Sequence, residues 1–195
     1  MGLQAFRNSL RTKIAITGFG LLFAFGLQAD LEQEYQTIEW IELMPVDDLN
    51  ALLNPPEVIL NIEDGSSMDN MATLKSVKEE DEDAQRFYEA LKSARVVGEF
   101  DNRAIRIPGF VVPLVNDENN LVTEFFVVPY FGACLHLPPP PPNQILHART
   151  DEGFELDSLQ QPFWFEGTIK IEQSETDLGT SAYRLNLDTL RLYEE

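Results

Sequence analysis

The sequence predicts a mainly β fold, in which a small antiparallel barrel follows an extended N-terminal segment and one helix. From Val96 onward, β-branched and aromatic runs alternate with polar turns. Just before them, residues 79–94 have the apolar spacing of a helix. Five or six strands in about 100 residues need closure or a second layer to bury their apolar side. The spacing alone leaves two alternatives open, an OB-like barrel and a sandwich.

The first 29 residues are typical of a secretory signal peptide. Three basic residues precede an apolar core of 14 residues, Ile14 to Leu27, which is shorter than a membrane-spanning helix. We expect cleavage after Ala29, although Leu27 is larger than the residue usual at that position, so an uncleaved anchor stays open. The remaining chain has no comparable apolar run. We therefore predict a periplasmic protein without a membrane span once the signal is removed.

Residues 30–95 form the predicted N-terminal segment, with a loop and a helix packed on the barrel. Trp40 is expected to dock onto the core, and residues 51–78 have the composition of turns and a mobile loop. In the predicted helix, acidic residues occupy the first turn, where the helix dipole favours them. We expect Phe87, Tyr88 and Leu91 to face the barrel.

The barrel-like domain is predicted over residues 96–195. Its strands are expected at the runs rich in β-branched and aromatic residues, which are Val96 to Phe100, Ala104 to Leu114, Thr123 to Tyr130, Gln144 to Arg149, Phe163 to Glu172 and Ser181 to Tyr193. Polar turns and a proline tract separate them.

The charge of the chain is strongly negative. The formal net charge is −19, and removal of the predicted signal takes away three of the 14 basic residues and none of the 33 acidic ones, which gives 11 − 33 = −22. Such a charge repels phosphate backbones and anionic lipid headgroups. Nucleic acid is therefore excluded as a partner, whereas cations or a basic protein surface fit. Solubility of an exported domain is the alternative explanation.

The stretch from Pro129 to Arg149 holds the chemically distinctive residues. It contains the only cysteine, Cys134, and both histidines, His136 and His147. If Cys134 and His136 lie on one strand they share a face, and a thiolate beside an imidazole suits zinc or copper. His147 is a candidate third ligand, with Glu124 or water as a fourth. Two alternatives stay open, a buried Cys134 with a hydrogen-bonded His136, and thiol chemistry at Cys134.

Five consecutive prolines, Pro138, Pro139, Pro140, Pro141 and Pro142, follow this motif. They predict a stiff polyproline II rod without backbone donors, standing out as a ridge. Beside Tyr130 and Phe131 the ridge is a candidate partner-binding surface, and the alternative is that it only shapes the loop. Asn143 and Gln144 are expected to hydrogen-bond backbone groups where the chain re-enters the sheet.

Common signatures of enzymes, such as a G-x-S-x-G elbow, an H-E-x-x-H motif or a phosphate-binding glycine loop, do not occur in the sequence. We therefore favour an exported, non-enzymatic accessory or binding protein, without any assigned catalytic residue. The alternative is a thiol-dependent enzyme or redox protein that uses Cys134 with a histidine. An accessible catalytic thiol would alkylate readily, whereas a buried or metal-bound one would not.

The strings PYFGACLHLPPPPPNQI, GFVVPL at Gly109 to Leu114, FWFEGTI at Phe163 to Ile169 and the W-x-x-L-M-P element from Trp40 resemble an uncharacterised family of exported Gram-negative bacterial proteins. The resemblance covers nearly the whole chain after the signal. It implies an OB-type barrel, genes often beside those of MacB-like ABC transporter subunits, and a setting of metal-ion homeostasis. The implied partners are ABC transporter subunits or other periplasmic proteins. The resemblance implies no definite cofactor, and zinc is the candidate. No catalytic or binding residue is carried over.

Overall fold

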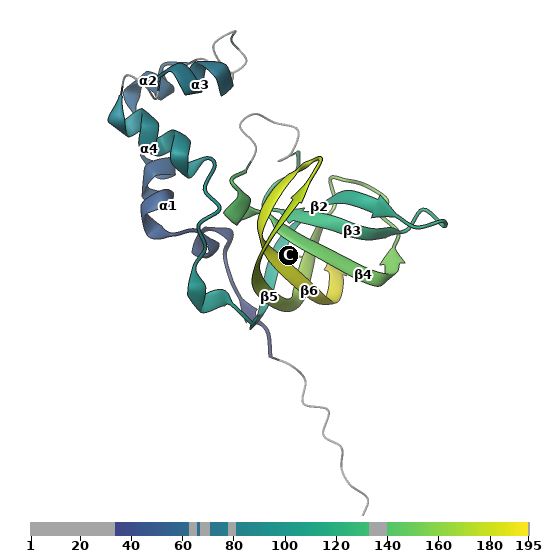
Figure 1. The fold of residues 1–195 in the computed structure, drawn as a ribbon. Coiled ribbons are helices and arrows are strands. Elements are labelled where there is room, and N and C mark those ends of the chain that lie inside the picture. The colour runs from purple at the N-terminus through teal and green to yellow at the C-terminus, as the bar shows by residue number, and fades with distance from the viewer. Residues whose placement is uncertain (1–33, 63–65, 67–70, 78–80, 133–139, 195) are drawn as a thin grey trace, which may run out of the picture. The chain divides into compact units, whose positions relative to one another are not determined.

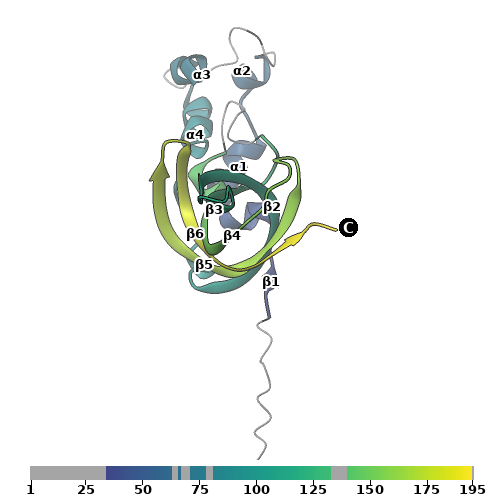
Figure 2. The same ribbon diagram turned by 90° about the vertical axis from the view of Figure 1, so that its right-hand side faces the viewer.

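The sheet of this protein closes on itself through its second and fifth strands. In the computed structural model, which describes residues 34–62, 66, 71–77, 81–132 and 140–194, the strand order is β1-β2-β3-β4-β6-β5, and β2 also pairs with β5. Figure 1 shows the resulting barrel, and Figure 2 shows it nearly end-on. The strands are β1 (Gln36–Thr37), β2 (Arg103–Asn116), β3 (Val122–Val128), β4 (Leu146–Phe154), β5 (Pro162–Thr176) and β6 (Gly179–Leu192).

The five strands β2 to β6 form the barrel, and this confirms the predicted mainly β, OB-like fold. Neighbours β2–β3, β3–β4, β5–β6 and β2–β5 are antiparallel, whereas β4 and β6 pair in parallel. The short β1 adds an extra parallel strand beside β2. The order in which β6 lies between β4 and β5 is that of a Greek-key barrel, not of a simple meander.

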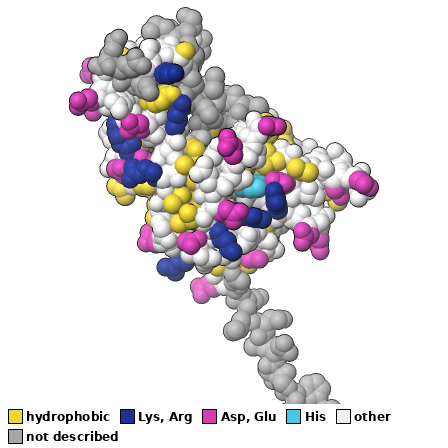
Figure 3. Space-filling model, viewed as in Figure 1, with side chains coloured by type: hydrophobic (Ala, Val, Ile, Leu, Met, Phe, Trp, Pro, Cys, Tyr) yellow, Lys and Arg dark blue, Asp and Glu magenta, His cyan; other side chains and the backbone are white. Residues whose placement is uncertain are grey.

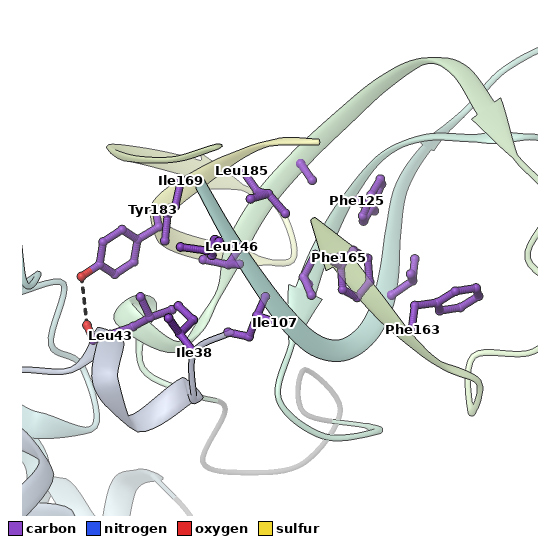
Figure 4. Close-up of a cluster of buried hydrophobic side chains, with 14 of the residues drawn as sticks. Ile38, Leu43, Ile107, Phe125, Leu146, Phe163, Phe165, Ile169, Tyr183 and Leu185 are labelled. Carbon is purple, nitrogen blue, oxygen red and sulfur yellow. Dashed lines mark hydrogen bonds between the residues drawn. The ribbon is translucent and has the colours of Figure 1, made fainter. Parts of the chain in front are cut away.

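Alternation along the strands fills the barrel interior. On β2, Ile105, Ile107, Gly109 and Val111 are buried while the residues that alternate with them are more exposed, as a period of two requires. The aromatic centre of the core comes from Phe125 on β3 and Phe165 on β5, whose ring centroids lie 6.1 Å apart. Figure 4 shows these rings among the aliphatic side chains that surround them.

Gly167 allows β5 to pass close to β6. A Cβ atom at this position would lie 2.2 Å from the backbone oxygen of Asn186, well inside contact distance. The register of the β5–β6 pair shifts at the same place, between Glu166 and Gly167. Glycine together with a bulge is a common way to bend a strand around a small barrel.

The N-terminal segment contains more helix than its sequence indicates. Helix α4 (Glu82–Ala90) confirms the core of the helix predicted over 79–94, and the Asp81 side chain accepts a hydrogen bond from Ala84 N at 2.9 Å. The stretch 51–78, which the sequence predicts to form turns and a loop, contains the end of α1 (Val46–Leu53) and all of α2 (Glu57–Leu60) and α3 (Met71–Val77). These helices are too short for a clear apolar period, and α4 packs mainly on α1 and α3.

The three residues predicted to pack α4 against the barrel differ in how deeply they are buried. Tyr88 is buried, whereas Phe87 and Leu91 are half-buried. Leu91 lines a surface hollow together with Ile145 and Leu178. Trp40 is held as predicted, because it packs against the barrel core and its indole N–H donates to Pro108 O at 2.7 Å.

Three polar side chains bind the N-terminal segment to the barrel domain. The Tyr183 hydroxyl on β6 donates to Leu43 O at 2.9 Å (Figure 4). It also accepts a hydrogen bond from Val97 N at 2.7 Å. Asn143 donates to Arg95 O at 3.0 Å, and Gln144 donates to Trp40 O at 2.8 Å. The predicted role of Asn143 and Gln144 as backbone hydrogen-bonding residues is therefore confirmed.

A buried carboxylate organises the helices. Asp48, in α1, has no solvent exposure and accepts hydrogen bonds from Arg86, Ser93 and Arg95. Its exposed neighbour Asp47 pairs with the same two arginines. Across the ranges that the structure describes, no helix combines the length and apolar character that crossing a bilayer requires.

Candidate functional site

The sequence-predicted site residues fall partly outside the described residues. Cys134, His136, Pro138 and Pro139 belong to the segment 133–139, for which the structure gives no description. The described members are His147 on β4, the aromatics Tyr130 and Phe131 after β3, and the last three prolines. The metal-ligand and partner-binding predictions for the undescribed residues stay predictions.

The outer face of β3 and β4 carries both a charged cluster and an apolar cluster. Phe125 and Val127 point into the barrel, so the residues between and beside them, Glu124, Phe126 and Val128, point outward. The register pairs Glu124 with Arg149 and Phe126 with His147 on β4. The pairing therefore places three ionisable side chains together on this face.

Glu124 is the centre of the charged cluster. Its Oε1 atom lies 2.8 Å from His147 Nε2 and 2.9 Å from Arg149 Nη2. His147 is only 4% exposed, and its ring meets Phe126 edge to face with centroids 5.7 Å apart. In Figure 3 the histidine lies on this face with dark blue and magenta side chains around it.

The electrostatics of Glu124 favour its ionised form. Burial would raise the pKa of this carboxyl, but the hydrogen bonds and charges of Arg149 and His147 outweigh the burial, so the pKa lies below its usual value. A carboxylate that fixes an imidazole through one ring nitrogen is the arrangement that orients a histidine for ligation or for proton transfer.

Two of the proposed metal ligands, His147 and Glu124, are brought together. Among the residues that the structure describes, no group of three or more His, Cys, Asp or Glu side chains has the spacing to hold a metal ion. His147 and Glu124 contact each other directly, so a metal bound at Nε2 would have to displace this hydrogen bond. A complete site would need the thiol and imidazole of Cys134 and His136, as the sequence predicts.

An apolar hollow of about 120 Å³ lies beside the charged cluster. Its walls are apolar side chains of β2 and β3, with Phe131 and two residues from distant loops, and its main members are Phe110, Val112, Val128, Phe131, Leu159 and Leu178. The rings of Phe110 and Phe131 lie 6.5 Å apart. Phe131, which lines the hollow, is 42% exposed, and the preceding residue Tyr130 is 46% exposed.

The last three prolines of the tract, which the structure describes, do not form a projecting ridge. Pro140 and Pro141 are buried and Pro142 is half-buried. Pro140 and Pro142 instead line a second hollow of about 190 Å³, with Ile145 and Leu91. The expected ridge is therefore wrong for these residues, because the 3-10 turn η3 (Pro142–Gln144) and the hydrogen bonds of Asn143 hold them against the domain.

Leu178 belongs to both hollows and was not among the predicted site residues. It lies in the turn between β5 and β6 and is 55% exposed. The sequence did contain a signal, since an apolar residue between Asp177 and Gly179 is unusual for a tight polar turn. Leu159, also in a polar connection, offered the same signal. Their convergence depends on tertiary structure.

A separate charged cluster lies on the outside of β2, β5 and β6. Glu166 is 4% exposed and is covered by Arg106 and Arg191, with Arg191 Nη2 at 2.6 Å from Glu166 Oε2. The Arg106 guanidinium also stacks over Trp164 at 4.2 Å. Both arginines pair with the one buried carboxylate, so we regard this cluster as structural.

Comparison with known proteins defines the class of protein. A solved structure similar to this chain comes from Pseudomonas aeruginosa PAO1 and is described as the crystal structure of a DUF3299 family protein. The relative has 32% sequence identity, the alignment covers 84% of this chain and 99% of that chain, and the TM-score is 0.59.

The chain belongs to this DUF3299 family, described as proteins of unknown function, because the family model matches residues 40–192. No curated protein matches this chain. The resemblance found in the sequence is therefore confirmed at the level of the family. The family description assigns no activity.

Proposed function

We propose that this chain is an exported, non-enzymatic accessory protein that binds a partner protein of the cell envelope. The observation that carries the proposal is the apolar outer face next to Tyr130 and Phe131, with two adjoining hollows on a highly acidic chain. Exposed aromatics beside an apolar hollow are typical of protein interfaces. The N-terminal signal-like segment supports the export part of the proposal.

The transport context and the metal context are the finer parts of this proposal. The partner is an ABC transporter subunit or another periplasmic protein, and the process is metal-ion homeostasis. The support comes from the family resemblance and from the paired soft and imidazole ligands in the sequence. Zinc is the metal we propose for Cys134, His136 and His147.

Site-specific photocrosslinking in the native cell tests the accessory role. A photoreactive residue at Phe131 should crosslink to a transporter subunit or another envelope protein, identified by mass spectrometry. The matched control is Leu53, which is 68% exposed in α1. N-terminal sequencing of the same material should find cleavage after Ala29. Absence of an envelope partner at Phe131, or equal crosslinks at both positions, would contradict the proposal.

A second candidate function is thiol chemistry at Cys134 with a histidine. Its support is the His147–Glu124 pair, which resembles the way in which a carboxylate orients a catalytic base. A catalytic thiol should react quickly with iodoacetamide near neutral pH in the folded protein. Slow alkylation that speeds up only after unfolding or chelation would exclude this candidate.

A further inference from the structure

The two hollows adjoin at Leu178, which lines both of them, and we treat them together as one surface. On one side of the β5–β6 turn lies the hollow with Phe110, Val112 and Phe131, and on the other side lies the hollow with Pro140 and Ile145. We call this surface the Leu178 face. Figure 3 shows hydrophobic side chains gathered beside the histidine on this side of the barrel.

The size of the first hollow limits what it can hold. Pockets for small molecules usually enclose about 300–1,000 Å³, whereas this hollow measures about 120 Å³. An engineered cavity of about 150 Å³ holds one benzene molecule. The hollow therefore suits a single apolar side chain, such as that of leucine, methionine or phenylalanine. Anchoring of one such side chain in a desolvated pocket is the usual energetic centre of a protein interface.

The charges around the Leu178 face limit the occupant further. Glu175 and Asp177 precede Leu178, and Glu155 and Asp157 precede Leu159, and all four acidic residues are exposed. Among the described residues that line the two hollows, one carries a charged side chain, Lys92, whose ammonium lies 4.4 Å from the centre of the Tyr88 ring. An occupant with lysine or arginine next to its apolar anchor would match this field, and an acidic one would be repelled.

We propose that the Leu178 face binds an extended segment of a partner protein, which inserts one apolar side chain into the 120 Å³ hollow and places basic residues against the acids before Leu159 and Leu178. This inference rests on the proposed accessory function and specifies the chemistry of the partner. The apolar anchor supplies affinity, and the basic residues supply selectivity and faster association.

Two synthetic peptides test the proposal. They share one central phenylalanine and differ only in their flanks, which are lysines in one and glutamates in the other. The full chain is expressed with its own N-terminal segment, purified, and labelled at leucine and valine methyl groups for NMR. We expect the lysine peptide, but not the glutamate peptide, to shift the methyl signals of Val112, Val128, Leu159 and Leu178. The affinity should fall as salt rises.

Two variants and one control complete the test. Leu178→Glu should weaken binding of the lysine peptide by about 10-fold or more, since it removes the apolar side chain that lines both hollows. The double change Glu175→Lys and Asp177→Lys keeps the hollow and should abolish the preference for the lysine peptide. Leu53→Glu, a matched exposed leucine in α1, should bind as the wild type does.

The outcomes separate this inference from the accessory function. Equal shifts from both peptides, or shifts confined to other methyl groups, would overturn the basic-segment proposal even if Phe131 crosslinks to an envelope partner. A concentration-dependent dimer that Leu178→Glu dissolves would assign the Leu178 face to a second copy of this chain and overturn the proposal as well. Selective binding of the lysine peptide without any crosslink in cells would support the face and contradict the accessory role.

Discussion

The hydroxyl of Tyr183 donates a hydrogen bond to the carbonyl oxygen of Leu43, a residue 140 positions earlier in the chain. The hydroxyl oxygen of Tyr183 also accepts a hydrogen bond from the backbone N–H of Val97. One side chain of the last strand therefore satisfies two backbone groups of the segment that precedes the barrel. Because Leu43 and Tyr183 are both fully buried, water cannot replace these bonds.

Replacement of Tyr183 by phenylalanine should destabilise the protein without changing its fold. The ring stays in place, but the Leu43 oxygen and the Val97 N–H lose their partner, and an unsatisfied buried group costs about 1–3 kcal/mol. Urea denaturation followed by fluorescence measures the loss. Tyr193→Phe, at a position 38% exposed, is the control and should be near neutral. Equal stability of Tyr183→Phe and wild type would show that the bonds contribute nothing.

Stability at high pH should also depend on Tyr183. Burial raises the pKa of this phenol above its usual 10.0, although the hydrogen bond from Val97 acts in the opposite direction. A raised pKa in the folded state means that the stabilisation is complete below pH 10 and is lost as the pH rises through the folded pKa. The stability of wild type should therefore fall in that range more steeply than that of Tyr183→Phe. Parallel pH profiles of the two proteins would contradict this prediction.

Glu124 should contribute a stability that disappears in acid. Its pKa lies below the usual 4.5, so its contribution is present above that value and is lost as the pH falls through the lower, folded pKa. Glu124→Gln keeps an acceptor for His147 and Arg149 but cannot ionise. We expect the variant to be less stable than wild type at pH 7 and to approach wild type near pH 3. A constant difference across this range would show that the charge of Glu124 has no role.

Asp48 and Asp47 provide a matched pair for the arginine network. Asp48→Asn removes a fully buried charge from Arg86 and Arg95 and should cost about 3 kcal/mol, the low end for a broken buried pair, because both arginines keep solvent contact. Asp47 is 58% exposed at its side chain, so Asp47→Asn should cost less than about 1 kcal/mol. Thermal unfolding of the two variants gives the comparison. Equal costs would mean that burial of Asp48 is irrelevant.

Gly167→Ala should be costly because the added methyl group would overlap the backbone of β6. Asn186 O lies 2.2 Å from the place of the new Cβ, and a backbone atom cannot move aside as a side chain does. Overpacking typically costs about 1–3 kcal/mol, and we expect the upper end. Gly98→Ala is the control, since no atom lies within 4 Å of its Cβ position. Similar unfolding midpoints for the two variants would refute the close approach of β5 and β6.

If the protein binds zinc, its affinity for zinc should depend on the ligands predicted from the sequence, Cys134, His136 and His147. Calorimetric titration should show a loss of about 10-fold or more in affinity for each of Cys134→Ser, His136→Ala and His147→Ala. Glu124→Gln should weaken binding as well, because Glu124 is the candidate fourth ligand and lies next to His147. If all variants bind zinc as wild type does, these residues are structural and scattered surface acids hold the metal.

The sequence predicts the barrel well because its strands alternate clearly. Ile105, Ile107 and Val111 follow a period of two, and the Asp81 cap marks the start of α4. The short helices α1 to α3 are not predictable in this way, since tertiary contacts rather than an apolar period stabilise them. The sequence identifies His147 and Glu124 as candidate site residues, but it does not identify Leu159 and Leu178. The connections before and after β5 bring these leucines to one hollow, and no local pattern predicts that contact.

The parallel pairing of β4 with β6 has a consequence for the order of assembly. A nascent chain that lacks residues 179–192 leaves β4 and β5 without their shared neighbour, and Leu43 without the hydroxyl of Tyr183. The domain can therefore close only after almost the whole chain has left the ribosome, and such non-local closure is slow. For the proposed export, this means that the chain stays unfolded, and so able to pass through a secretion channel, until β6 is available.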